Sequence, residues 1–143
     1  MQVPVDISLI HPDAVKPEYQ TPGAVAFDIA VIEEKTIQPG AIEKFQTGLV
    51  IGVPKDHVLL LAARSSNAKK AIQLANGVGV IDQDYGGPTD QLHLALYNIG
   101  TVPYTVQKGE RLAQGLLVPI VRGIFNVVER VEQIDRGGFG TTG

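Results

Sequence analysis

Cysteine is absent from this chain of 143 residues. Without thiols, neither a disulfide framework nor a thiolate metal site can form. Histidine is scarce, and His11, His57 and His93 lie too far apart for a metal-binding motif such as HExxH. We therefore expect no cluster of protein ligands that would hold a metal directly.

Long apolar runs are missing as well. No run reaches the roughly 18 residues that a membrane-spanning helix requires. The N-terminal run from Met1 to Asp6 lacks the basic and apolar regions of a signal peptide. The sequence therefore predicts a soluble, cytoplasmic protein with no membrane partner.

The charge balance excludes one class of ligand and favours another. The formal net charge of −3 argues against a broad nucleic-acid-binding face. Between Asp56 and Asp82 there is no acidic residue, yet this stretch contains Arg64, Lys69 and Lys70. A local cationic pocket in an acidic protein suits a small phosphorylated ligand better than a polymer. On this feature alone, an ordinary solvated face is an equal alternative.

Glycine and proline are abundant and spread along the chain, with 16 and nine residues respectively. Frequent turns between short apolar segments are typical of an all-β sandwich or barrel. The chain is long enough for one domain with a real core. Strands are expected at residues 3–9, 24–32, 41–53, 58–63, 92–98, 102–106, 111–119 and 124–131.

One segment and the chain end depart from this pattern. Residues 66–75 contain good helix formers, with Ser66 as a candidate cap and Asn76-Gly77 as a stop, so we expect a short helix there. Residues 136–143 are rich in glycine and carry the lone aromatic Phe139. This tail is either frayed or a ligand-binding segment, because Phe139 could stack on a base while neighbouring amides and hydroxyls bind phosphate.

Two internal segments could carry chemistry. Apolar residues run into Asp82, and they could remove water from its carboxylate and favour general-base chemistry; a plain turn is the alternative. Arg64-Ser65-Ser66 precedes the expected helix, where a guanidinium, hydroxyls and helix amides make an anion site or simply an N-cap. A Walker-type loop is absent, so any phosphate site here is not a P-loop.

Together these segments resemble the trimeric dUTPase family. Five motifs occur in the family's order, at residues 22–29, 63–68, 76–87, 109–114 and 136–143. The resemblance implies a distorted jelly-roll or β-barrel-like fold with one short helix. It also implies a homotrimer whose active sites each draw on three subunits, with a domain over residues 1–135 and a tail over residues 136–143 that closes over a site.

The resemblance assigns roles residue by residue. Asp82 would be the general base that activates water for attack on the α-phosphorus of dUTP, releasing dUMP and pyrophosphate. Alternation cannot choose between Asp82 and Asp84, since both share a face if the strand continues, so this choice depends on the family register. Asp28 would support the phosphate and metal region. The implied substrate-binding residues are Arg64, Ser65, Ser66, Asn76, Val80, Ile81, Tyr85, Gln114, Arg136, Phe139, Gly140, Thr141 and Thr142.

Within this set, Tyr85 would exclude a 2′-hydroxyl, and the hairpin around Val80 and Ile81 would read uracil together with Asn76. The family uses Mg²⁺ held through the triphosphate and water, in keeping with the ion's preference for phosphates and retained waters. By limiting dUTP, such an enzyme limits uracil incorporation into DNA and supplies dUMP for thymidylate synthesis.

This sequence departs from the family pattern in three places. Asn67 stands where an apolar residue is usual. The loop at residues 86–91 is longer than the common form, and Gly86 replaces a long side chain. Arg136 lies closer to Gly138-Phe139 than in the commonest version of the fifth motif.

Three alternatives to the hydrolase were weighed. A dCTP deaminase shares the fold, but Ala95 stands where deaminases carry a catalytic glutamate. A nucleotide-binding regulator without activity would be favoured by loss of Asp82 or the tail, and both are present. A purely structural β-domain would leave the five motifs unexplained.

Overall fold

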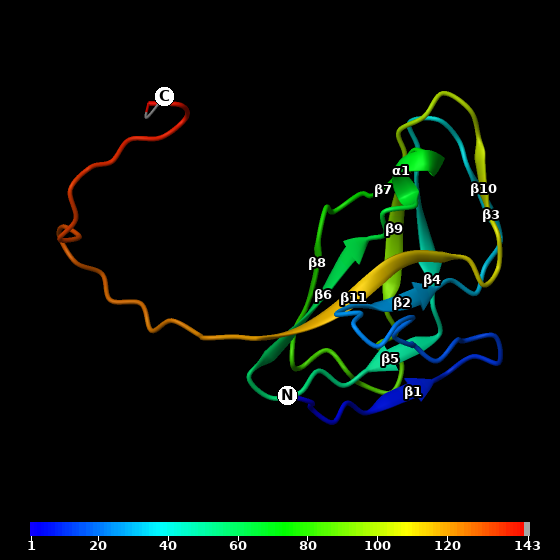
Figure 1. Ribbon diagram of the computed structural model, residues 1–143, viewed down its shortest axis with the longest axis horizontal. Helices are drawn as coiled ribbons and strands as arrows, with labels where there is room; N and C mark the ends of the chain where they lie inside the picture. The colour runs from blue at the N-terminus through cyan, green and yellow to red at the C-terminus, as the bar shows by residue number, and fades with distance from the viewer. Residues whose placement is uncertain (142–143) are drawn as a thin grey trace.

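The computed structural model describes residues 1–141, which form a β-rich body and a long C-terminal arm (Figure 1). Over these residues there are eleven strands and one helix. In chain order they are β1 (Ile7–Leu9), β2 (Phe27–Ala30), β3 (Lys35–Ile37), β4 (Ile42–Gln46), β5 (Leu49–Ile51), β6 (His57–Ala63), α1 (Asn67–Lys70), β7 (Ile72–Leu74), β8 (Gly79–Ile81), β9 (His93–Asn98), β10 (Tyr104–Val106) and β11 (Arg111–Pro119). The expected fold class, nearly all β with one short helix, is confirmed.

Two sheets provide most of the core. The larger has the strand order β2-β11-β6-β8, and the other has the order β4-β9-β7; β1 pairs with β5, and β3 with β10. Every pair is antiparallel, so side chains alternate between the core and the outside along each strand. Phe45, Leu59 and Leu96 are fully buried between the sheets.

The pairing of β6 with β11 is the longest in the fold and leaves one face of the larger sheet partly open. Leu59 and Leu61 face the core, so their neighbour Leu60 and its cross-strand partner Leu116 face outward. Val58 lies two residues before Leu60 on the same face, opposite Val118. These four outward side chains are only half buried, so this face is apolar and residues 1–141 cover it only in part.

The helix is much shorter than expected. It was predicted over residues 66–75, but it ends at Lys70 because Ala71 adopts a left-handed backbone with φ of 52°. The following residues form β7, whose Ile72 and Leu74 are buried against β9. The burial of these two alternating apolar side chains therefore outweighed the helix propensity of residues 71–75. Ser66 occupies the cap position, but its side chain makes no capping hydrogen bond.

Two other strand predictions were wrong. The segment 41–53 is interrupted at Gly48, whose φ of +64° turns the chain between β4 and β5. An added Cβ at Gly48 would lie 2.8 Å from the Cβ of His11, so only glycine fits. Residues 124–131 form no strand, because this segment contacts no partner strand within the described chain. Strand β3 was not foreseen.

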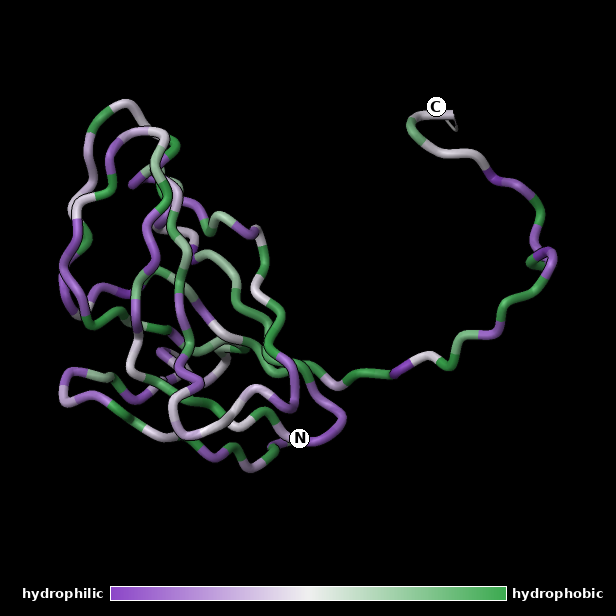
Figure 2. The backbone as a smooth tube through the Cα atoms, turned by 180° about the vertical axis from the view of Figure 1, so that it is seen from behind, coloured by the Kyte–Doolittle hydropathy of each residue, from purple (hydrophilic) through white to green (hydrophobic). Residues whose placement is uncertain are grey.

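The C-terminal arm leaves the body after β11 and extends far from it (Figure 1). Apolar residues recur along it, as the hydropathy colouring of Figure 2 shows. Ile124, Phe125, Val127 and Ile134 are almost fully exposed. An exposed apolar segment of this length indicates a surface that is normally covered. No helix in residues 1–141 is long and apolar enough to cross a membrane.

Candidate active site

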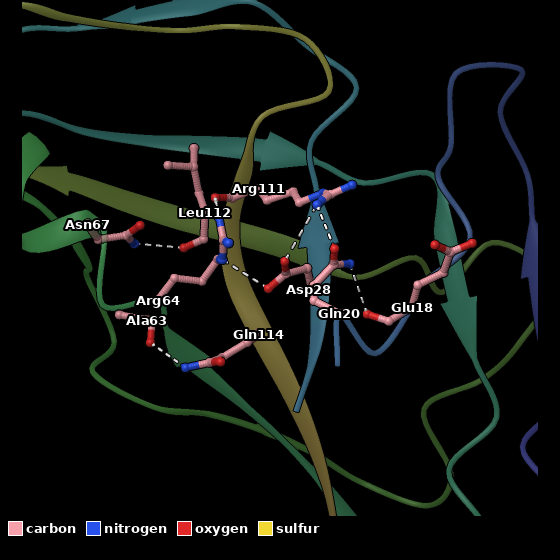
Figure 3. Close-up of polar contacts among 9 residues, drawn as sticks. All are labelled: Glu18, Gln20, Asp28, Ala63, Arg64, Asn67, Arg111, Leu112 and Gln114. Atoms are coloured by element: carbon pink, nitrogen blue, oxygen red, sulfur yellow. Dashed lines mark hydrogen bonds and ion pairs between the residues drawn. The ribbon is translucent and has the colours of Figure 1, made fainter. Parts of the chain in front are cut away.

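Two arginines converge on one carboxylate at the end of the larger sheet (Figure 3). Asp28 in β2 accepts a contact from Arg64 Nε at 2.9 Å through Oδ1, and Arg111 Nη1 lies 3.8 Å from its Oδ2. The Asp28 side chain is only 10% exposed, whereas both arginines reach solvent. Two guanidinium groups and one carboxylate leave an excess of positive charge, which suits an anionic ligand.

An irregular backbone in β11 explains why the second motif (residues 63–68) forms hydrogen bonds to the fourth motif (residues 109–114). The register with β2 shifts between Arg111 and Ala113, so the intervening carbonyls need other partners. Arg64 Nη1 donates to the Arg111 carbonyl at 3.0 Å, and Asn67 Nδ2 donates to the Leu112 carbonyl at 2.7 Å. Asn67, the unusual residue of the second motif, is therefore a buried structural link rather than a ligand-facing group.

The remaining predicted phosphate residues surround this cluster. Ser65 is exposed, while Ser66 Oγ is buried and has no hydrogen-bond partner among the described residues. Gln114 lies in β11 opposite Asp28, and its Nε2 donates to the Ala63 carbonyl at 3.0 Å. One N–H of this amide stays available. The structure thus brings Asp28, Arg64 and Gln114 to one end of the sheet.

A separate small cavity of about 120 Å³ lies between the hairpin before β8 and strand β9. Asn76 and Gly79 line its hairpin side, and Lys44, His93 and Ala95 line the side of the β4-β9-β7 sheet. Burial, and then the nearby Lys44 charge, lower the pKa of His93. The cavity therefore presents a neutral imidazole near neutral pH and contains no carboxylate.

The candidate base stands at the end of β8. The strand ends at Ile81, and the next residues form a turn in which the Tyr85 amide donates to the Asp82 carbonyl at 3.2 Å. Strand geometry therefore does not continue to Asp84, so the condition under which Asp82 and Asp84 would share one face is not met. Asp82 is exposed. The apolar residues of its own chain therefore do not remove water from its carboxylate, although the sequence had led us to expect it.

Tyr85 occupies a fixed position beside this turn. Its ring packs against the hydrophobic core, and its hydroxyl donates to the Gln91 carbonyl at 2.8 Å. Val80 is exposed on the outer side of the hairpin, and Ile81 packs against the core. The segment after β8 thus holds an aromatic side chain whose position is fixed by the core and by Gln91.

The base and the arginine cluster lie far apart within one chain. Ile81 pairs with Leu59, so Asp82 lies beside Val58 near the start of β6, while Arg64 follows its end. Arg64 lies six positions after Val58, or about 20 Å along the strand at roughly 3.3 Å per residue. A triphosphate ester bound at Arg64 could not present its α-phosphorus to Asp82 of the same chain.

The predicted tail residues are not assembled with either group. Arg136, Phe139, Gly140 and Thr141 are exposed at the far end of the arm. Phe139 has a φ of 51° and sits in a turn in which the Thr141 amide donates to the Gly138 carbonyl at 3.2 Å. Thr142 lies outside the described residues.

Several further residues at these sites could not be identified from the sequence. Arg111 lies within the fourth motif, but only the shift in register aims it at Asp28. Gln20 accepts a hydrogen bond from Arg111 Nη1 at 3.2 Å and has no signal in the sequence. Lys44 lies in β4 and His93 lies in β9. Their proximity follows from the pairing register of these two strands, which cannot be read from the sequence.

Comparisons with known proteins identify the family of this chain. The family model described as dUTPase matches residues 13–143. A deoxyuridine 5′-triphosphate nucleotidohydrolase of Desulfitobacterium hafniense is 40% identical, over 99% of this chain and 97% of its own length. The Bordetella pertussis protein of the same name is 41% identical, over 89% and 87% of the two chains.

Solved structures extend the likeness to the fold. The Staphylococcus bacteriophage 80alpha dUTPase, solved with dUpNHpp, superposes with a TM-score of 0.89, at 22% identity over 99% of both chains. The dUTPase of phage phi11 of S. aureus gives 0.83, at 21% identity over 92% of this chain and all of that one. At these identities the likeness concerns the fold alone. From the family match and the curated relatives, the chain belongs to the dUTPase family.

Proposed function

We propose that this protein hydrolyses dUTP to dUMP and pyrophosphate. The observation that carries the proposal is the cluster of Arg64 and Arg111 around Asp28, an anion-binding group in a chain of this family. The cavity lined by Asn76 and Gly79 supports recognition of a nucleoside, since its volume of about 120 Å³ suits one pyrimidine ring. Removal of dUTP would limit uracil incorporation into DNA and supply dUMP for thymidylate synthesis.

Asp82 acts as the general base in this proposal. Its carboxylate takes a proton from a water molecule as the water oxygen forms a bond to the α-phosphorus. The bond from this phosphorus to the oxygen that bridges to the β-phosphate breaks, and pyrophosphate leaves with the electron pair. Exposure of Asp82 in the single chain leaves room for the water and the substrate beside it.

The remaining residues bind and orient. Arg64, Ser65, Ser66 and Gln114 hold the triphosphate, and Asn76 with the backbone at Val80 and Ile81 reads uracil. Tyr85 packs against the deoxyribose. Phe139 stacks on the base as the tail closes, and Arg136, Gly140, Thr141 and Thr142 approach the terminal phosphates. Closure would exclude water and strengthen the charged contacts.

The charge distribution fits a Mg²⁺ ion bound mainly through the substrate. Residues 1–141 contain no group of three or more acidic or histidine side chains that could hold a metal. Asp28 Oδ2 is buried without a hydrogen-bond partner among these residues, so it could accept a hydrogen bond from a metal-bound water. The ion would neutralise charge on the triphosphate.

A homotrimer with shared active sites forms part of the proposal. The separation of about 20 Å between Asp82 and Arg64 supports the proposal that these groups of one active site come from different subunits. The apolar outer face at Leu60 and Leu116 provides a surface for subunit contact. The exposed arm supplies a second one, and a groove of about 960 Å³ between the N-terminal segment and β11 could receive it from a neighbour.

The single most informative experiment measures product formation from dUTP, dCTP, dTTP and UTP, with and without Mg²⁺. We expect pyrophosphate and dUMP from dUTP in the presence of Mg²⁺ and little product from the others. Ammonia from dCTP would instead indicate a deaminase, although Ala95 in the cavity cannot relay the proton that deamination requires. Binding of dUTP without turnover would indicate a regulator.

The expected cytoplasmic location stays a prediction, which fractionation of the source cells would test.

A further inference from the structure

The longer loop at residues 86–91 has no role in the function proposed above, yet it is well ordered by its own contacts. Asp90 Oδ2 accepts a hydrogen bond from the Gly87 amide at 2.8 Å, and the Asp90 amide donates to the Gly87 carbonyl at 3.0 Å. An added Cβ at Gly87 would lie 2.8 Å from Asp90 Oδ2. The loop is therefore a closed turn in which a larger residue at position 87 would displace the Asp90 carboxylate.

Gln91 attaches the loop to the connection between β4 and β5. Its Oε1 accepts a hydrogen bond from the buried Gly48 amide at 2.8 Å, and its Nε2 donates to Gln46 Oε1 at 3.3 Å. The next residue continues the attachment, since the Leu92 amide donates to the Leu49 carbonyl at 2.8 Å. Because a buried amide without a partner is costly, the Gly48 contact fixes the position of Gln91.

The same residue holds the aromatic ring at the start of the loop. The Tyr85 hydroxyl donates to the Gln91 carbonyl at 2.8 Å, while the ring packs against the core. Tyr85 is thus fixed at both ends, by its backbone after β8 and by its hydroxyl on Gln91. The position of Gln91 depends in turn on Gly48.

We propose that residues 86–91 act as a latch that holds the Tyr85 ring in place, and that Gln91 is a positioning residue for discrimination between deoxyribose and ribose. The inference rests on the proposed function, in which Tyr85 lies against the sugar. A ring excludes a 2′-hydroxyl only if it cannot move aside, because a displacement of about 1 Å is enough to change turnover strongly. The latch prevents that displacement without contacting substrate.

The test compares kcat and KM for dUTP and UTP in the full-length protein and five variants, one of which is Tyr85→Ala. In Gln91→Ala and Tyr85→Phe, we expect the ratio of kcat/KM for dUTP to that for UTP to fall about tenfold, the size of one buried hydrogen bond. The fall should come mainly from better use of UTP. Gln91→Glu retains an oxygen that accepts from Gly48 and should restore most of the ratio.

Thr89→Ala is the matched control, because Thr89 lies in the same loop with an exposed side chain that makes no hydrogen bond among the described residues. It should keep the wild-type ratio. Amide hydrogen exchange at Gly48 gives a readout independent of activity: we expect it to accelerate in Gln91→Ala and to stay slow in Gln91→Glu. Loss of structure alone would reduce turnover of both nucleotides equally and leave their ratio unchanged.

The outcomes separate the latch from the proposed function. If Gln91→Ala and Tyr85→Phe keep the wild-type ratio while Tyr85→Ala lowers it, the latch is wrong and the sugar contact stands. If Tyr85→Ala also keeps the ratio, the proposed role of Tyr85 fails and the latch fails with it. If the wild-type protein does not hydrolyse dUTP, the proposed function itself is wrong.

Discussion

Asp82 and Asp84 illustrate how much depends on a single residue. Both are exposed and both follow β8, but the turn gives their side chains different positions. Neither carboxylate is paired with a cation among the described residues, so pairing does not distinguish them. The assignment of Asp82 as the base rests on its place in the third family motif, and kinetic measurements can test it directly.

We predict that Asp82→Asn keeps nucleotide binding and lowers kcat by about a hundredfold or more, because an amide cannot accept the proton of the attacking water. Steady-state kinetics with dUTP and calorimetric binding of a non-hydrolysable analogue would check both parts. Asp84→Asn is the matched control and should keep most of the activity. If the two variants exchanged these effects, Asp84 would be the base.

Tyr104 gives a second prediction, on stability. Burial and a hydrogen bond to Glu110, whose Oε1 lies 2.7 Å from the hydroxyl, raise the pKa of Tyr104 from 10.0 to about 12. A pKa that is higher in the folded state stabilises the fold below pH 10.0, and this stabilisation is lost as the pH rises to about 12. Tyr104→Phe should therefore melt at a lower temperature than the wild type below pH 10.0.

The difference in melting temperature between the two proteins should then shrink as the pH approaches 12. Thermal melts over this range give the measurement, and the variant serves as the control for the other groups that ionise at alkaline pH. A constant difference would show that the hydroxyl proton does not stabilise the fold.

At the scale of elements, the irregular register of β11 sets the geometry of the phosphate cluster. The carbonyls of Arg111 and Leu112 are satisfied by side chains from the segment after β6. Gly115 farther along β11 allows Phe27 to approach, since an added Cβ would lie 2.6 Å from the ring. Close packing and the shifted register together fix where Arg111 and Gln114 point.

We predict that Asn67→Leu, the usual apolar type at this position, destabilises the protein by about 1 kcal/mol, because the Leu112 carbonyl loses its donor. The effect stays small because Asn67 Oδ1 is itself buried without a partner, and the substitution removes that cost. Denaturant unfolding would measure it, with Lys69→Ala on the same helix as the control. Equal stability of Asn67→Leu and the wild type would show that the carbonyl finds another donor.

The elements also show what the sequence could and could not predict. Strand β11 was predicted with its correct ends, since its apolar run is bounded by turn residues on both sides. The helix was predicted too long because the burial of Ile72 and Leu74 depends on β9, which lies far along the chain. In the same way, the sequence indicated Arg64 and Asp28 separately, but only the sheet order brings β2 and β6 to either side of β11.

At the scale of the whole molecule, the arm determines what one chain can do alone. Residues 120–141 extend away from the body with their apolar side chains exposed, and the tail that carries Phe139 lies at the far end (Figure 1). The proposed division into a domain over residues 1–135 and a closing tail stays a prediction. Ending the chain at Asp135 should leave a folded trimer with little activity, which size measurement and kinetics would check.

Mixed trimers test whether the base and the tail of one active site come from different subunits. Asp82→Asn chains and chains that end at Asp135 should each be nearly inactive alone. Refolded together in equal amounts, they should regain activity, because about a quarter of the sites then combine an intact base with an intact tail under random assembly. If base and tail came from the same chain, no mixed site would contain both, and the mixture would stay inactive. A control mixture of the shortened chain with an Asp82→Asn chain that also ends at Asp135 should show no recovery.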